Sequence, residues 1–125
     1  MSFVPTKEEK LIQQSAREFA KRWLKPILAE LDRTGAFPSD AVRLMAEYDF
    51  LGMFLPSALG GSEAGYASYL VVIEELSRVC AAVASILVNH SAAAYAIQRW
   101  GSEAQKQNCL PLLASGESLG GFAVF

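Results

Sequence analysis

Side chains able to do acid–base or nucleophilic chemistry are few and scattered in this sequence. The single histidine, His90, has no cysteine or carboxylate at metal-ligand spacing, and a general base needs a positioned partner. Glu74 and Glu75 are adjacent, so on a helix they would point about 100° apart and could not share a proton. Cys80 and Cys109 lack metal-ligand spacing and a disulfide-rich context. We predict no catalytic residue and no metal site here, but a packed histidine, one solvated and one tied glutamate, and two reduced packing cysteines.

Two glycine pairs could be mistaken for phosphate-binding loops. Gly60-Gly61 has no strand pattern before it and no cluster of helix amides directly after it, and a phosphate cradle requires both. Gly120-Gly121 lacks the GxGxxG spacing of a dinucleotide-binding loop. The first pair therefore predicts a turn, and the sequence carries no dinucleotide fingerprint.

The most apolar segment carries three residues at positions that share a helix face. Ala84, Val88 and Ala92 stand at i, i+4 and i+8 in a helix expected over residues 81–99. From the residues alone, the favoured interpretation is a stripe on which another helix packs closely.

The remaining elements follow from helix-start and helix-stop signals. Thr6 with Glu9 predicts a capping box, and Pro26, which lacks an amide hydrogen, predicts a kink or a restart. Ser39 and Asp40 are expected to cap the next helix. The expected helices cover about residues 7–31, 40–48, 67–78, 81–99 and 103–115. No glycine or proline separates residues 67–78 from 81–99, so the residues alone also allow one long helix.

The longest irregular stretch, residues 51–65, is unusually apolar for a loop. It contains Met53, Phe54 and Leu55 among glycine and proline turn residues. We expect it to pack either on this domain or on a missing one.

The last predicted helix is followed by a segment of a different kind. Ser102 predicts its start, Leu110, Leu112 and Leu113 its apolar stripe, and Gly116 its end. Residues 119–125 then predict a strand, which needs a sheet to satisfy its backbone. No other segment has a strand pattern, so we expect the chain to be part of something larger.

Composition narrows the class of protein. Hydrophobic residues make up 52% of the 125 residues, and the 19% of charged residues is below the ~25% that is typical. This balance suggests that other protein covers part of the surface. Eleven basic and thirteen acidic residues form no basic stripe, so a nucleic-acid partner is not predicted.

Neither a targeting segment nor a membrane span is predicted. The first ten residues lack the basic and apolar regions of a signal peptide, so we expect a cytoplasmic protein. Residues 79–98 carry no formal charge and approach bilayer-spanning length, but polar residues interrupt them. We expect a buried central helix there.

Several motifs in order resemble one family. The segment GSEAQKQNCLPLLASGESLGGFAVF is similar to the stretch that joins the N-terminal helical domain to the middle β-domain of flavin-dependent acyl-CoA dehydrogenases. Upstream, GAFPSDAVRLMAEYDFLGMFLPSALGGSEAGY, VVIEELSRVC and SILVNH match the same family in the expected order. The resemblance implies an all-α, five- to six-helix, bundle-like domain over residues 1–118, with a turn near Cys80. It also implies that residues 119–125 begin a strand of a missing middle domain, and that the C-terminal domain is missing too.

The resemblance to acyl-CoA dehydrogenases also implies a function. Intact enzymes of this family use FAD to oxidise acyl-CoA to trans-2-enoyl-CoA in fatty acid β-oxidation, with a glutamate base in their later domains. It therefore implies an acyl-CoA substrate, FAD in the intact enzyme, an electron-transfer acceptor and a homo-oligomer. Residues 1–125 alone are expected to be inactive, and to help line the acyl-chain tunnel and cover the flavin site.

Two sets of site residues follow from the resemblance. Ala84, Val88 and Ala92 align with residues that contact the fatty acyl group. The two alanines would leave the tunnel open, which predicts tolerance of a medium, long or branched chain.

Phe122, Val124 and Phe125 fall on the strand that passes beside the flavin ring in this family. Phe125 stands where the family pattern F-A-x-T-E-P has threonine, so it cannot donate that hydrogen bond. Its ring can still stack on the flavin or wall it, and the alternatives are a strand that packs differently or core strand residues that do not contact the cofactor.

Other functions remain open. Flavin monooxygenases and nitroalkane oxidases resemble the same scaffold, and the Phe125 departure gives that interpretation some support. A stand-alone helical interaction module is a third interpretation. It would have to oligomerise or bind a partner to cover its apolar helix.

Overall fold

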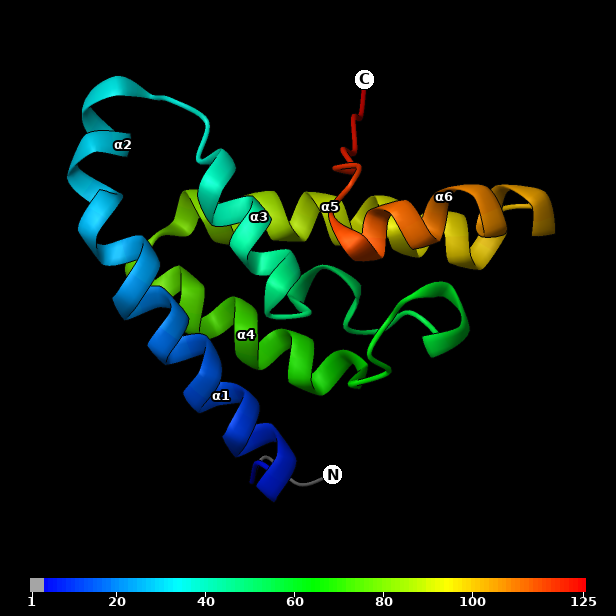
Figure 1. Cartoon of the computed structure of the whole chain (residues 1–125), viewed down its shortest axis with the longest axis horizontal. Helices are drawn as coiled ribbons and strands as arrows, with labels where there is room; N and C mark the ends of the chain where they lie inside the picture. The colour runs from blue at the N-terminus through cyan, green and yellow to red at the C-terminus, as the bar shows by residue number, and fades with distance from the viewer. Residues whose placement is uncertain (1–3) are drawn as a thin grey trace.

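The computed structural model describes residues 4–125, and their regular structure is entirely helical (Figure 1). Six α-helices in these residues confirm the expected all-α, five- to six-helix domain. They are α1 (Lys7–Phe19), α2 (Leu28–Thr34), α3 (Ser39–Glu47), α4 (Gly65–Val79), α5 (Ala81–Trp100) and α6 (Glu103–Ser115). Met1–Phe3, the start of the stretch tested for a signal peptide, lie outside the described residues.

Helix α4 packs between α1 and α5, and α5 also packs along α6 (Figure 1). The segment between α3 and α4 folds back against α5 and α6 and contains two short 3-10 turns, Phe50–Gly52 and Ser57–Leu59. Among the helices of the described residues, none combines the length and hydropathy that a membrane-spanning segment requires.

The segment from α1 to α2 begins and bends where the sequence predicts. The Glu9 amide donates to Thr6 Oγ1 over 3.1 Å and the Thr6 amide donates to Glu9 Oε2 over 2.8 Å, which completes the capping box. A π turn, Ala20–Leu24, and a 3-10 turn, Lys25–Ile27, separate α1 from α2 at Pro26. The missing amide of Pro26 breaks the regular ladder there, so the expected kink is confirmed.

The prediction that Ser39 and Asp40 cap α3 is wrong. The helix begins at Ser39 itself, Pro38 occupies the cap position, and no side chain caps it. The Pro38 carbonyl accepts the first helical bond from the Val42 amide over 3.1 Å. Ser39 and Asp40 therefore lie inside the first turn, where Asp40 still suits the positive end of the helix.

A single extended residue, Cys80, separates α4 from α5. Its φ of −144° and ψ of 96° interrupt the helix, although its amide still donates to the Leu76 carbonyl over 2.8 Å. The turn near Cys80 is confirmed, and the alternative of one long helix is excluded. Cys80 and Cys109 are both free thiols, the first buried and the second half-buried.

The apolar loop packs on this domain. Met53 joins the main core formed by α1, α3, α4 and α5, while Leu55 and Leu59 join a second core against α5 and α6. Leu55 has no exposed surface. Burial of these side chains resolves the question of where the loop packs, and it fixes the loop's path across the domain.

Helix α6 follows its predicted cap and stop but not all of its predicted stripe. Ser102 and Gln105 form a capping box, and Gly116 ends the helix with a φ of 77°. Leu110 and Leu113, three residues apart, are buried together, whereas Leu112 lies off that face and is 38% exposed.

Residues 119–125 form no strand in this structure. They leave the helices without regular secondary structure, since the part of the chain that the structure describes offers no strand to pair with (Figure 1). Phe122 and Val124 are 53% and 83% exposed, and Phe125 is fully exposed. The domain boundary at residue 118 stays a prediction.

Candidate functional site

Helix α5 does not present Ala84, Val88 and Ala92 as one surface. Ala84 is 3% exposed and lies in the main core, whereas Val88 is 44% exposed and Ala92 is half-buried. Each step of four residues turns the helix about 40° past a full turn, so the stripe drifts off the core face. Only Val88 and Ala92 reach a surface recess.

That recess, which we call the aromatic recess, has a volume of about 220 Å³. It lies where the loop before α4, the start of α4 and the middle of α5 meet. Its lining residues are Phe54, Tyr66, Tyr69, Val88, Ser91, Ala92 and Tyr95. The sequence interpretation named only Val88 and Ala92 of this set. The spacing of Tyr66 and Tyr69 on one helix face was the signal that could have extended it.

Ring contacts hold the walls of the aromatic recess. Phe54 stacks on Tyr66 with ring centroids 5.1 Å apart and meets Tyr69 edge-on at 5.7 Å. Tyr95 of α5 contacts Tyr66 at 6.2 Å and Trp100 at 5.8 Å. Trp100 is 72% exposed, so the aromatic surface continues beyond the recess. Exposed apolar surface of this kind marks an interface or a ligand site.

The polar groups of the aromatic recess do not supply a base. Burial raises the pKa of the Tyr69 phenol above its ordinary value, and a hydrogen bond with Ser91 opposes that rise. Tyr69 is therefore protonated at neutral pH. The lining suits an apolar ligand rather than a reacting centre.

The second predicted set is not brought into this recess. Phe122, Val124 and Phe125 line none of its walls. They follow a groove of about 290 Å³ between α5, α6 and the chain after α6. Its lining is Ala93, Ile97, Cys109, Leu112, Leu113, Ser118, Gly120 and Gly121.

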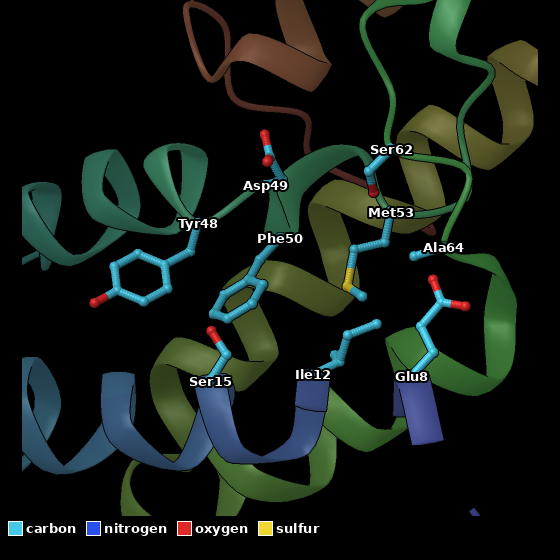
Figure 2. A pocket seen from close by; sticks show the side chains of 9 residues that line it. All are labelled: Glu8, Ile12, Ser15, Tyr48, Asp49, Phe50, Met53, Ser62 and Ala64. Carbon is cyan, nitrogen blue, oxygen red and sulfur yellow. The ribbon is translucent and has the colours of Figure 1, made fainter. Parts of the chain in front are cut away.

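A further recess of about 250 Å³ lies between α1 and residues 48–64 (Figure 2). Met53 reaches down from that segment toward Ile12 of α1, while the Asp49 carboxylate points away from α1. Its lining is Glu8, Ile12, Ser15, Tyr48, Asp49, Phe50, Met53, Ser62 and Ala64. No imidazole, amine or thiol belongs to this lining.

His90 is the packed histidine that the sequence predicts. It has no exposed surface, its Nε2 lies 3.2 Å from the Leu51 carbonyl oxygen, and its Nδ1 accepts from the Gly120 amide over 3.0 Å. Burial lowers the pKa of the imidazole, and the carbonyls of Leu51 and Leu113 oppose that shift. His90 is therefore neutral at physiological pH.

The two adjacent glutamates divide as predicted. Glu74 pairs with Arg78 at the surface, while Glu75 is 3% exposed and faces α1. Glu75 accepts from Arg17 over 2.9 and 3.2 Å and from Gln13 over 3.0 Å. The hydrogen bond from Arg17 holds the pKa of the Glu75 carboxyl below its ordinary value, although burial acts against it.

Glu75→Gln should lower the free energy of unfolding at pH 7 by about 1–2 kcal/mol, because charge-assisted bonds become neutral ones. Since the folded pKa of Glu75 is depressed, its contribution is complete above the unfolded pKa of about 4.5 and is lost as pH falls through the folded value. Denaturant melts from pH 7 to pH 3 should therefore show a smaller acid loss in Glu75→Gln than in wild type. Glu74→Gln is the control, and an equal acid loss in Glu75→Gln would contradict the assignment.

Acidic and sulfur-bearing side chains do not converge on a metal site. Across residues 4–125, no group of three or more histidine, cysteine, aspartate or glutamate side chains is arranged to hold an ion. The site that the geometry supports is thus an apolar recess on a helical domain.

Comparison with known proteins identifies the class. Residues 6–117 match the model of the acyl-CoA dehydrogenase N-terminal domain. This chain belongs to that family, and its helical fold is the fold of the family's N-terminal domain.

Matches to individual proteins agree with this family assignment. The chain is 40% identical over 125 residues to a short-chain-specific acyl-CoA dehydrogenase of Clostridium acetobutylicum, covering 99% of this chain and 33% of that protein. It is 37% identical over 124 residues to an acryloyl-CoA reductase (NADH) of Anaerotignum propionicum, covering 99% and 32%. The solved structure of butyryl-CoA dehydrogenase from Megasphaera elsdenii superposes with a TM-score of 0.87 at 28% identity, covering 95% of this chain and 32% of that chain. This chain thus spans about a third of the length of each. These matches favour the acyl-CoA dehydrogenase interpretation over a monooxygenase, a nitroalkane oxidase or a stand-alone module.

Proposed function

We propose that this chain is the N-terminal domain of an FAD-dependent acyl-CoA dehydrogenase, and that its aromatic recess receives part of the acyl chain. The observation that carries the proposal is the placement of Val88 and Ala92 in an apolar recess of a chain that belongs to this family. Apolar burial there stabilises a hydrocarbon chain and offers nothing to a charged ligand. Ala84 lies in the main core and does not line the recess.

The chain's own residues can hold only an edge of the flavin. Phe122, Val124 and Phe125 are exposed, and among the described residues their backbone groups have no hydrogen-bond partners. Free amide and carbonyl groups beside apolar side chains fit the polar edge and flat face of a flavin ring. When bound, FAD accepts the hydride from the acyl-CoA. Domains beyond these residues would have to supply the base, the thioester contacts and the rest of the cofactor site.

The domain's share of the reaction is then positioning and exclusion of water. The aromatic walls would hold the alkyl chain, and the packed helices would keep water from the reacting carbons. The exposed aromatic surface around Trp100 would be covered by further domains or by another subunit. The wider proposal includes a homo-oligomer, an electron-transfer acceptor and a cytoplasmic location.

The first experiment is the intact mass of the endogenous protein, detected with an antibody raised against residues 1–125. A mass about three times that of this chain supports the proposal, since the chain covers 33% and 32% of the relatives above. The purified full-length protein should then carry FAD and form trans-2-enoyl-CoA from acyl-CoA. A mass equal to that of residues 1–125, or a full-length protein that binds no flavin, would overturn it.

Ala92→Phe in the full-length enzyme should lower kcat/KM for long acyl chains at least tenfold more than for butyryl-CoA. A phenyl ring in the aromatic recess would occupy the space of several methylene groups, each worth about 1–3 kcal/mol in an apolar pocket. Ala82→Phe, at an exposed position of the same helix outside the recess, is the matched control. Equal effects of Ala92→Phe on all chain lengths would show that the acyl chain lies elsewhere.

A further inference from the structure

We propose that His90 is a positioning residue that sets the path of the chain from α6 into residues 119–125, and that it does so in one neutral tautomer. It joins three parts of the fold: the 3-10 turn at Leu51, helix α5, and the backbone at Gly120. Leu51 and Gly120 lie 39 and 30 residues from His90 in sequence, so the histidine ties together segments that only the tertiary fold brings close.

The hydrogen bonds of His90 with Leu51 and Gly120 indicate the tautomer, and the Leu113 carbonyl is a further acceptor that acts on the ring. The Gly120 amide can only donate, so Nδ1 must be unprotonated to accept from it over 3.0 Å. The Leu51 carbonyl can only accept, so the ring proton must sit on Nε2, 3.2 Å from that oxygen. The charged imidazolium and the other neutral tautomer would each leave the Gly120 amide facing a second N–H.

The backbone also approaches α5 closely at the same point. A Cβ at Gly120 would lie 2.9 Å from Ala93 Cβ and 3.2 Å from the His90 carbonyl oxygen. The chain therefore passes directly over α5, and only glycine fits without a shift. A Cβ at Gly121, one residue later, would meet nothing within 4 Å.

The hydrogen bond at Gly120 is the last one before the exposed residues 121–125. Gly116 and Ser118 donate to the carbonyls of Leu113 and Leu112, and Gly120 donates to His90. Beyond Gly120, no hydrogen bond joins residues 121–125 to the rest of the described chain. The direction in which Phe122 and Phe125 leave the domain is thus set at His90. The consequence for flavin placement rests on the proposed function, whereas the positioning role does not.

The test begins with nitrogen NMR of His90 in this chain, without flavin. We expect an unprotonated Nδ1, a protonated Nε2, and a coupling or shift signature of the Gly120 amide hydrogen bond. A protonated Nδ1, or an imidazolium at pH 7, would overturn the proposal whatever any variant does.

Amide hydrogen exchange in variants separates positioning from general packing. His90→Leu should speed exchange at Gly120 about tenfold, which is the loss of one hydrogen bond, while Leu87 in the buried middle of α5 keeps its protection. His90→Gln should restore Gly120 protection, because its amide oxygen can accept and its amide nitrogen can donate at similar spacing. Faster exchange at Leu87 and Gly120 alike in both variants would mean that His90 only fills the core.

The matched pair Gly120→Ala and Gly121→Ala tests the close approach. Only Gly120→Ala should weaken the Gly120 bond and shift the amide resonances of residues 119–125. Equal shifts in both variants would contradict the proposal. In the full-length protein, His90→Leu should alter the flavin absorption spectrum and His90→Gln should restore it. A wild-type protein without flavin would instead reject the proposed function and leave the NMR result standing.

Discussion

Phe19→Ala is expected to lower the free energy of unfolding by about 3–5 kcal/mol, the largest loss that we predict for a single substitution in this domain. Phe19 has no exposed surface and belongs to the main core. Its ring meets Tyr48 and Phe50 edge-on, with centroids 5.0 and 5.5 Å apart. Alanine would lose the burial and both ring contacts and would leave a cavity between α1 and the turn after α3.

Total stability of a small domain is about 5–15 kcal/mol, so this single change should move the urea midpoint far enough to be unmistakable. The measurement is urea denaturation followed by circular dichroism. Phe37→Ala is the matched control because Phe37 is 54% exposed in the segment before α3, and it should cost less than about 1 kcal/mol. A loss below about 1.5 kcal/mol for Phe19→Ala would mean that the core collapses readily around the missing ring.

Gly61→Ala is expected to cost about 3 kcal/mol, at the upper end for overpacking. A Cβ at Gly61 would lie 2.0 Å from the Leu55 carbonyl oxygen, 2.4 Å from its carbonyl carbon and 2.6 Å from its Cβ. Two of these three atoms are backbone, so relief requires the whole turn to move rather than one side chain to rotate.

That movement should reach the aromatic recess. Phe54 directly precedes Leu55 and stacks on Tyr66, so displacement of the turn changes the wall of the recess. Near-ultraviolet circular dichroism should therefore change together with the urea midpoint. Gly121→Ala, where nothing lies within 4 Å, should change neither signal. An unaltered near-ultraviolet spectrum in Gly61→Ala would show that the recess is built independently of this turn.

The residues at which most helices begin and end could be predicted, because they depend on residues nearby in the sequence. Thr6 with Glu9, and the αL glycine Gly116, act through bonds within three or four residues. The break at Pro26 follows from the missing amide of one residue. The start of α3 departed from this rule, since Pro38 took the cap position that Ser39 was expected to hold.

The sequence could predict that a buried polar side chain would have a hydrogen-bond partner, but not which residue that partner would be. Adjacent glutamates on a helix must diverge, so one tied and one solvated carboxylate followed from geometry. Arg17 lies 58 residues from Glu75, and Leu51 lies 39 residues from His90. Such separations have no local signal, and only the packing of α1 on α4 and of the loop on α5 decides them.

The sequence by itself determined the helical class, the positions of most helix ends, and the family to which residues 6–117 belong. Those properties follow from hydrophobic period, capping chemistry and ordered motifs, all of which act over short stretches. Tertiary structure alone decided that Ala84 belongs to the core while Val88 and Ala92 open onto a recess. It also decided that four aromatic rings line that recess and that residues 119–125 form no strand. The physical reason is that a helix face drifts with each turn and a strand needs a partner, so both outcomes depend on what packs alongside.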